Sequence, residues 1–265
     1  MLNGMPKRVL VAAPGFEQHI IDECLQQGIS CTHIGEQLYT TDDLATNLAW
    51  SLCIWDDVQE IRIESIGHAA KVLRESGPYW SFYPLNNVRR CQLIQDKLLK
   101  IKDKPFAYNP EKRLKARGAF CLLDEHTMLY ARSLNKPYVD GIIPYEADRV
   151  NPPARAYLKI WESLTLLQDQ PKPGEKVLEL GAAPGAWTWC FAALGAECHS
   201  VDRAPLDPRI DSLPNVHHRQ CDAFALKPED EMADWLCSDL ICYPDRLIQM
   251  INEWLEHGHC QKYII

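Results

Sequence analysis

Short apolar runs alternate with amphipathic segments along the C-terminal half of the chain. Four of these runs have the length and composition of buried strands, at residues 176–180, 197–202, 216–221 and 235–238. A segment of helical character at 187–194 follows the first run, and an amphipathic one at 246–256 precedes an apolar run that begins near 263. This alternation predicts an α/β fold in which a parallel, doubly wound, Rossmann-like sheet is covered by helices.

The N-terminal half has a less regular pattern, which predicts a mixed α+β unit. Its apolar runs predict short strands near 7–12 and 58–64 and a hairpin over 119–123 and 127–132. Its amphipathic segments predict helices near 44–55 and 88–102. The stiff segment Asn151-Pro152-Pro153 interrupts both patterns. We therefore predict one domain over residues 1–150 and a second over 151–265.

A seven-residue loop, Gly181-Ala182-Ala183-Pro184-Gly185-Ala186-Trp187, joins the first predicted strand of the second half to its helix. Its two glycines allow a positive φ and a close approach of the backbone to a ligand. The pyrophosphate of NAD or FAD requires a further glycine where this loop has Ala183 and then Pro184. The loop therefore favours S-adenosylmethionine (SAM), which has no phosphate, and a turn that binds no ligand is the remaining alternative.

Acidic residues stand at the ends of the neighbouring predicted strands. Asp202 closes the second strand, Asp222 follows the third, and Asp239 follows the fourth. The carboxyl ends of parallel strands meet at one edge of the sheet, where such folds bind ligands. We predict that Asp202 accepts the ribose hydroxyls of the cofactor and that Asp222 accepts the adenine amino group. The alternative for Asp222 is a solvated loop position.

Four segments together resemble a known family, the FtsJ-like RNA 2′-O-methyltransferases. They are residues 155–159 (RAYLK), the GAAPGAW loop, residues 201–206 (VDRAPL) and residues 237–239 (CSD). Within the family, the chain is most similar to the ribosomal RNA large subunit methyltransferase M group, and residues 9–17 also match how those proteins begin. The resemblance implies SAM contacts at Ala156, Gly181, Ala183, Pro184, Gly185, Ala186, Trp187, Asp202, Asp222 and Asp239. Ala186 stands where the family pattern has a glycine, and its methyl group is expected to crowd the cofactor side.

The resemblance also implies a Lys–Asp–Lys–Glu catalytic tetrad, of which Lys159 and Asp239 are the first two members. A ribose 2′-hydroxyl is a poor nucleophile, so the enzyme must hold it in line with the methyl group and remove its proton. The second lysine, which is the family's base, and the glutamate are expected beyond Ile265. On this basis we expect a truncated domain that binds SAM weakly or not at all and is catalytically defective.

Composition places further bounds on the function. The eleven cysteines lack C-x-x-C spacing, which indicates a reducing, cytoplasmic compartment rather than a disulfide framework. We expect no metal site, no membrane segment and no signal peptide. The net charge of −8 is unusual for an RNA-binding protein, yet one stretch of the chain is strongly basic. It contains Arg89, Arg90, Lys97, Lys100, Lys102, Lys104, Lys112, Arg113, Lys115 and Arg117.

We therefore expect an enzyme that methylates RNA and whose N-terminal half recognises RNA through this basic stretch. The alternative for the stretch is a solvated face. The resemblance implies that the N-terminal half is ferredoxin-like with a short THUMP-like part, and that the substrate is large-subunit ribosomal RNA, at a cytidine. The rival hypotheses are a non-catalytic RNA-binding protein with a vestigial methyltransferase fold, and a methyltransferase that acts on a protein or a small molecule.

Overall fold

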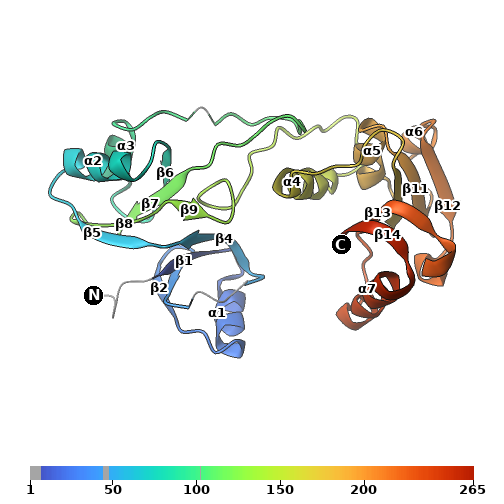
Figure 1. The fold of residues 1–265 in the computed structure, drawn as a ribbon, viewed down its shortest axis with the longest axis horizontal. Coiled ribbons are helices and arrows are strands. Elements are labelled where there is room, and N and C mark those ends of the chain that lie inside the picture. The colour runs from blue at the N-terminus through green and yellow to red at the C-terminus, as the bar shows by residue number, and fades with distance from the viewer. Residues whose placement is uncertain (1–6, 44–47, 102) are drawn as a thin grey trace. The chain divides into compact units, whose positions relative to one another are not determined.

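The computed structural model describes residues 7–43, 48–101 and 103–265. The chain divides into two compact units, shown in Figure 1. The first unit contains residues up to 104 together with 112–144. The second contains 105–111 and 145–265, so the main division falls at 144/145 rather than at 150/151. The short segment 105–111 belongs to the second unit although the residues that follow it, 112–144, belong to the first.

The first unit begins with a five-stranded antiparallel sheet of order β2-β3-β1-β4-β9. Its strands are β1 (Arg8–Ala12), β2 (Cys31–Gly35), β3 (Leu38–Thr41), β4 (Ser51–Asp56) and β9 (Ser133–Leu134). Helix α1 (Glu17–Gln26) joins β1 to β2 and buries Ile20 and Cys24 against Leu10 and Tyr39. The order β2-β3-β1-β4, with a helix between β1 and β2, is that of a ferredoxin-like sheet.

A four-stranded sheet of order β5-β8-β7-β6 completes the first unit. Its elements are β5 (Gln59–Arg62), α2 (Ile66–Ser76), β6 (Trp80–Phe82), α3 (Val88–Gln95), β7 (Gly118–Leu122) and β8 (Thr127–Ala131). Strands β7 and β8 pair antiparallel, which confirms the predicted hairpin. Both helices pack on one core, where Ala70 and Leu73 of α2 meet Cys91 and Ile94 of α3.

Two helix predictions in this unit are wrong in part. The segment predicted as a helix over 44–55 forms strand β4 from Ser51 onward, while 44–47 lie outside the described residues. Cys53, Ile54 and Trp55 are all buried because β4 is covered on both faces, and consecutive buried positions do not distinguish a strand from a helix. Helix α3 ends at Gln95, well before the predicted Lys102, which also lies outside the described residues.

The second unit is a five-stranded, fully parallel sheet of order β12-β11-β10-β13-β14 (Figure 1). Its strands are β10 (Lys176–Leu180), β11 (Glu197–Asp202), β12 (Val216–Gln220), β13 (Met232–Ser238) and β14 (His259–Ile264). Its helices are α4 (Tyr157–Leu167), α5 (Ala186–Ala193), α6 (Pro208–Asp211) and α7 (Pro244–His257), with 3₁₀ turns at Ala223–Ala225 and Pro228–Asp230. The predicted Rossmann-like α/β fold is confirmed.

Both faces of this parallel sheet are covered, as is usual for parallel sheets. Val177 of β10 points into a core shared with α4 and α5, represented by Trp161 and Phe191. The next residue, Leu178, points to the opposite face and packs with Trp254 of α7. Helices α4 and α5 therefore cover one face of the sheet, and α7 covers the other.

Candidate active site

The predicted acids gather at the carboxyl edge of the parallel sheet. In the register of the sheet, Leu180 lies beside Val201 of β11 and beside Ser238 of β13. The residues that follow these three positions are Gly181, Asp202 and Asp239, so all three emerge at one edge. Neighbouring strands lie about 4.8 Å apart, which brings these groups within the span of one small ligand.

The glycine loop has the backbone conformation that its sequence predicts. Gly181 has φ +84° and Gly185 has φ +103°, both in the region that favours glycine. A Cβ atom on Gly181 would lie 2.9 Å from the side chain of Leu240, and one on Gly185 would lie 3.0 Å from Ile210. Both glycines are therefore required by the packing of the loop as well as by its turn.

Asp202 fixes this loop from the neighbouring strand. Its Oδ2 accepts a hydrogen bond from the backbone N–H of Ala183 at 2.9 Å, and its Oδ1 accepts one from Ala204 at 2.9 Å. An ionised carboxylate offers about four acceptor positions, so each oxygen keeps capacity for one more donor. The half-buried carboxylate is thus oriented by backbone and fits the predicted role of binding two ribose hydroxyls.

Ala156, Ala186 and Trp187 meet on the inner side of the loop. The Trp187 indole N–H donates to the backbone carbonyl of Ala156 at 3.0 Å and ties the start of α5 to the start of α4. The indole is 95% buried, and Ala186 beside it is also buried in the core. Trp187 therefore links the starts of α4 and α5. The cofactor contacts expected of Ala186 and Trp187 stay predictions. Within the loop, Pro184 is exposed and Gly181 and Ala183 are half-buried.

Lys159 and Asp239, the two predicted tetrad members, form an ion pair. The Lys159 ammonium on α4 donates to Oδ1 of Asp239 at 2.7 Å, across 80 residues of sequence. The Lys159 side chain is 63% exposed and that of Asp239 is 38% exposed, so a substrate can reach both. An exposed pair of this kind contributes only about 0–1 kcal/mol to stability.

Asp222 has two partners of its own. It accepts an ion-paired hydrogen bond from Arg203, and its Oδ1 caps the following 3₁₀ turn by accepting from the Phe224 N–H at 3.1 Å. The Arg203 guanidinium, followed by the Phe224 N–H, lowers the pKa of the Asp222 carboxyl. Its contact with adenine stays a prediction.

A buried acidic residue beneath the site was missed from the sequence. Glu179 in β10 is 2% exposed, and its Oε2 accepts from the Thr188 hydroxyl at 2.5 Å. The Thr188 hydroxyl also lies 2.9 Å from that of Ser200. Burial, with smaller contributions from the charges of Asp239 and Asp202, raises the pKa of Glu179 to about 8. The only signal in the sequence was an acid inside an otherwise apolar strand.

The predicted RNA-contacting side chains lie on the surface, with one exception. Arg89, Lys97, Lys100, Lys104, Arg113 and Lys115 are exposed, whereas Arg90 and Lys112 are half-buried. Arg117 is a correction, because its side chain is only 2% exposed and pairs with Asp103, with Nη2 2.9 Å from Oδ1. Its guanidinium also lies over the Tyr138 ring, 4.4 Å from the centroid. Arg117 is therefore a core residue of the first unit and is not available to RNA.

The described part of the chain contains no group of three or more His, Cys, Asp or Glu residues arranged to hold a metal ion. None of the helices that it contains is both long and apolar enough to span a membrane. All eleven cysteines are free thiols. Burial raises the pKa of several of them, for example Cys91 to about 11 and Cys190 to about 12, so these thiols are protonated at neutral pH.

Comparison with known proteins shows what the part of the chain around this site is similar to. Residues 153–251 match the FtsJ-like methyltransferase family. The resemblance inferred from the motifs is confirmed, and the matched segment includes Lys159, the glycine loop, Asp202, Asp222 and Asp239.

Curated relatives of the FtsJ-like segment carry the name ribosomal RNA large subunit methyltransferase M. The protein from Halorhodospira halophila is 38% identical over 108 residues, which cover 40% of this chain and 32% of that protein. The protein from Xanthomonas campestris pv. campestris is 33% identical over 173 residues, 62% of this chain and 48% of that protein. The chain thus spans between a third and a half of the relatives that it matches.

Solved structures add nothing further to the assignment. TrmN from Thermus thermophilus aligns over 95% of this chain and 84% of its own, at 12% identity and a TM-score of 0.33. Coclaurine N-methyltransferase bound to N-methylheliamine and SAH aligns over 42% of this chain and 36% of its own, at 20% identity and a TM-score of 0.29.

Proposed function

We propose that this protein is a SAM-dependent 2′-O-ribose methyltransferase that acts on large-subunit ribosomal RNA, at a cytidine. The observation that carries the proposal is the Lys159–Asp239 ion pair, at 2.7 Å, at the same sheet edge as the glycine loop and Asp202. The FtsJ-like family match and the names of the curated relatives support the reaction class and the ribosomal substrate. Cytidine as the target nucleoside rests on the family resemblance.

The residues at the sheet edge fit SAM as the cofactor. The loop allows the backbone to approach a ligand at Gly181 and Ala183. The Asp202 carboxylate, which is oriented by the backbone N–H groups of Ala183 and Ala204, keeps acceptor capacity for ribose hydroxyls. No phosphate-binding glycine is present at Ala183, which suits a cofactor without pyrophosphate. When bound, SAM supplies an electrophilic methyl group on a sulfonium.

Lys159 and Asp239 position the ribose in this proposal. The carboxylate of Asp239 accepts a hydrogen bond from the 2′-hydroxyl and orients the oxygen lone pair toward the cofactor side of the loop. The ammonium of Lys159 donates to Asp239, fixes its position, and adds positive charge beside the oxygen, where negative charge develops as the proton leaves. Positioning of this kind can contribute several kcal/mol to the lowering of a barrier.

The first unit is proposed to bind the RNA through the exposed members of its basic stretch. Lys97, Lys100 and Lys104 lie on the surface around the end of α3, and Arg113 and Lys115 lead into β7. Cations on one segment neutralise phosphates without reading sequence, which makes the affinity depend on salt. The cofactor site and the RNA-binding surface thus fall in different units of the chain.

The direct test is single-turnover methyl transfer from labelled SAM to unmodified large-subunit ribosomal RNA, with protein in excess and long incubation. Lys159→Met is compared with Lys172→Met, an exposed lysine that precedes β10 at the opposite edge of the sheet. We expect slow labelling of a ribose 2′-oxygen by the wild type and the control variant, in keeping with the expected catalytic defect, and at least about 100-fold slower transfer for Lys159→Met. Mass spectrometry of the digested RNA locates the methyl group.

Each other outcome has a defined meaning. Label on a base, or on protein, contradicts the proposal. RNA binding without methyl transfer supports instead a non-catalytic RNA-binding protein that keeps a methyltransferase fold. Equal rates for Lys159→Met and Lys172→Met would remove Lys159 from the site while leaving the enzyme class standing.

A further inference from the structure

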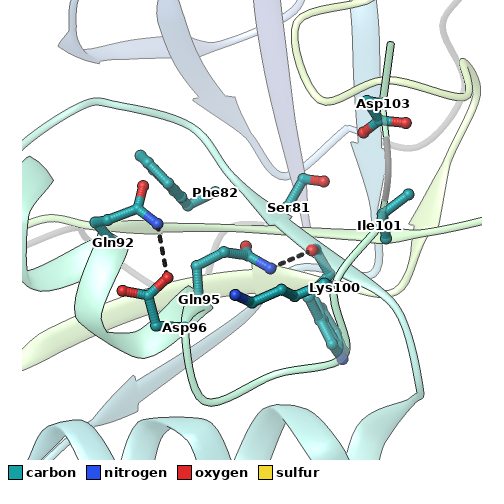
Figure 2. A pocket seen from close by; sticks show the side chains of 9 residues that line it. Ser81, Phe82, Gln92, Gln95, Asp96, Lys100, Ile101 and Asp103 are labelled. Atoms are coloured by element: carbon teal, nitrogen blue, oxygen red, sulfur yellow. Dashed lines mark hydrogen bonds between the residues drawn. The ribbon is translucent and has the colours of Figure 1, made fainter.

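A polar pocket lies beside α3 in the first unit, and none of the residues assigned to methyl transfer lines it. It encloses about 390 Å³, enough for one nucleoside. Figure 2 shows the side chains that line it. They are Trp80, Ser81, Phe82, Gln92, Gln95, Asp96, Lys100, Ile101 and Asp103, and we call this set the α3 pocket.

The α3 pocket contains a buried acceptor without a donor. The side-chain amide of Gln95 donates from Nε2 to the backbone carbonyl of Trp80 at 2.9 Å, which fixes the orientation of the amide. Its Oε1 is buried and, within the described residues, receives no hydrogen bond. Buried polar atoms are nearly always paired, and leaving one unpaired costs about 1–3 kcal/mol. The Gln95 oxygen therefore suits a ligand that carries a hydrogen-bond donor.

Two carboxylates of the lining, Asp96 and Asp103, also accept hydrogen bonds and so favour a ligand with donors. Asp96 accepts from the Gln92 amide at 3.1 Å, and Asp103 is held by the buried Arg117. The Arg117 guanidinium also reaches the Ser81 hydroxyl, at 3.4 Å, so one buried cation fixes two lining residues. The pocket thus presents carboxylate and amide carbonyl oxygens on side chains whose positions are fixed by hydrogen bonds to neighbouring residues.

Apolar and cationic groups complete the lining. Phe82 is half-buried with its ring 6.1 Å from that of Phe120, so one side of it is supported by the core. An aromatic face in such a setting stacks on any base. Lys100 is exposed at the rim, and Lys97 and Lys104 lie on the surface near it in the chain. Acceptors inside and cations outside match a base with an amino group attached to a phosphodiester backbone.

We propose that the α3 pocket binds one unstacked nucleobase of the RNA and selects bases that carry an exocyclic amino group. The amino group donates to Gln95 Oε1, the ring stacks on Phe82, and the adjacent phosphate lies near Lys100. Uracil, which presents a carbonyl at the equivalent position, would place two acceptors against each other. This inference rests on the proposed function, because it assumes that the first unit binds RNA.

The test compares two short single-stranded RNAs, oligocytidine and oligouridine, labelled at one end and titrated with the whole chain in a fluorescence anisotropy assay. The wild type is expected to bind oligocytidine about five- to tenfold more tightly, since one buried hydrogen bond and the avoided acceptor clash are worth about 1–1.4 kcal/mol. Gln95→Met keeps the side-chain length, removes the acceptor and should abolish this preference. Gln18→Met, on the surface of α1 in the same unit, should keep it.

A second variant guards against misfolding of the first. Lys100→Gln changes an exposed residue and should weaken both RNAs equally while reducing the salt dependence of binding. Equal affinity of the wild type for the two RNAs, or a preference that survives in a folded Gln95→Met, overturns the pocket assignment and leaves the methyl-transfer proposal intact. Failure of the wild type to bind either RNA overturns the pocket assignment and the RNA-binding role of the first unit, whereas methyl transfer to ribosomal RNA is judged by its own assay.

Discussion

Replacing Glu179 by glutamine should stabilise the second unit at neutral and alkaline pH. The folded protein raises the pKa of this buried carboxyl from 4.5 to about 8, chiefly through desolvation. Between those values the unfolded chain has lost the proton while the folded chain retains it, so stability is complete below pH 4.5 and declines as pH rises toward 8. Over a span of about 3.5 pH units, at about 1.4 kcal/mol per unit, the upper limit of the loss is about 5 kcal/mol.

Glutamine keeps the acceptor for the Thr188 hydroxyl but cannot ionise, so Glu179→Gln should escape this decline. Hydrogen exchange of the 176–180 peptide, compared between variant and wild type at each pH, isolates the second unit and cancels the intrinsic pH dependence of exchange. We expect extra protection in the variant that grows from pH 5 to pH 8. Glu256→Gln, an exposed site on α7, is the control. A difference between variant and wild type that is constant across this range would refute the raised pKa.

Three further predictions concern single residues, each within one of the two units. Arg117→Met removes a buried guanidinium that bonds Asp103 and Ser81, and should lower the free energy of unfolding of the first unit by about 1–3 kcal/mol in urea titrations, which a surface RNA contact would not do. Gly181→Ala adds a Cβ 2.9 Å from Leu240 at φ +84° and should cost about 1–3 kcal/mol in thermal unfolding, with weakened SAM binding. Lys159→Met should change the free energy of unfolding by less than about 1 kcal/mol, because its ion pair is exposed.

The sequence predicted the second unit well because each signal there was local. An apolar strand, a glycine loop and a terminal acid each occupy a few residues, and the parallel sheet brings Asp202 and Asp239 to one edge without further information. Pairing of Lys159 with Asp239 followed from the family resemblance, since 80 residues separate them.

The sequence-based predictions failed where a charged residue is buried or where a strand is buried on both faces. Arg117 was assigned to a basic surface, but its side chain is buried in the first unit. Glu179 was overlooked because it lies in an otherwise apolar strand. Strand β4 was predicted as part of a helix because burial on both faces removes the alternation that marks a strand. In each case the deciding contacts are made by residues distant in sequence.

The central claim is that the sheet edge around Asp202 is a SAM site, and calorimetric titration of the chain with SAM tests it most directly. Asp202→Asn removes the charge and one acceptor that hold the loop, whereas Asp230→Asn changes an exposed acid of the same unit. We predict saturable one-to-one binding by the wild type and by Asp230→Asn, weakened at least about tenfold in Asp202→Asn. Absence of binding by the folded wild-type chain, or equal binding by Asp202→Asn, would contradict the account.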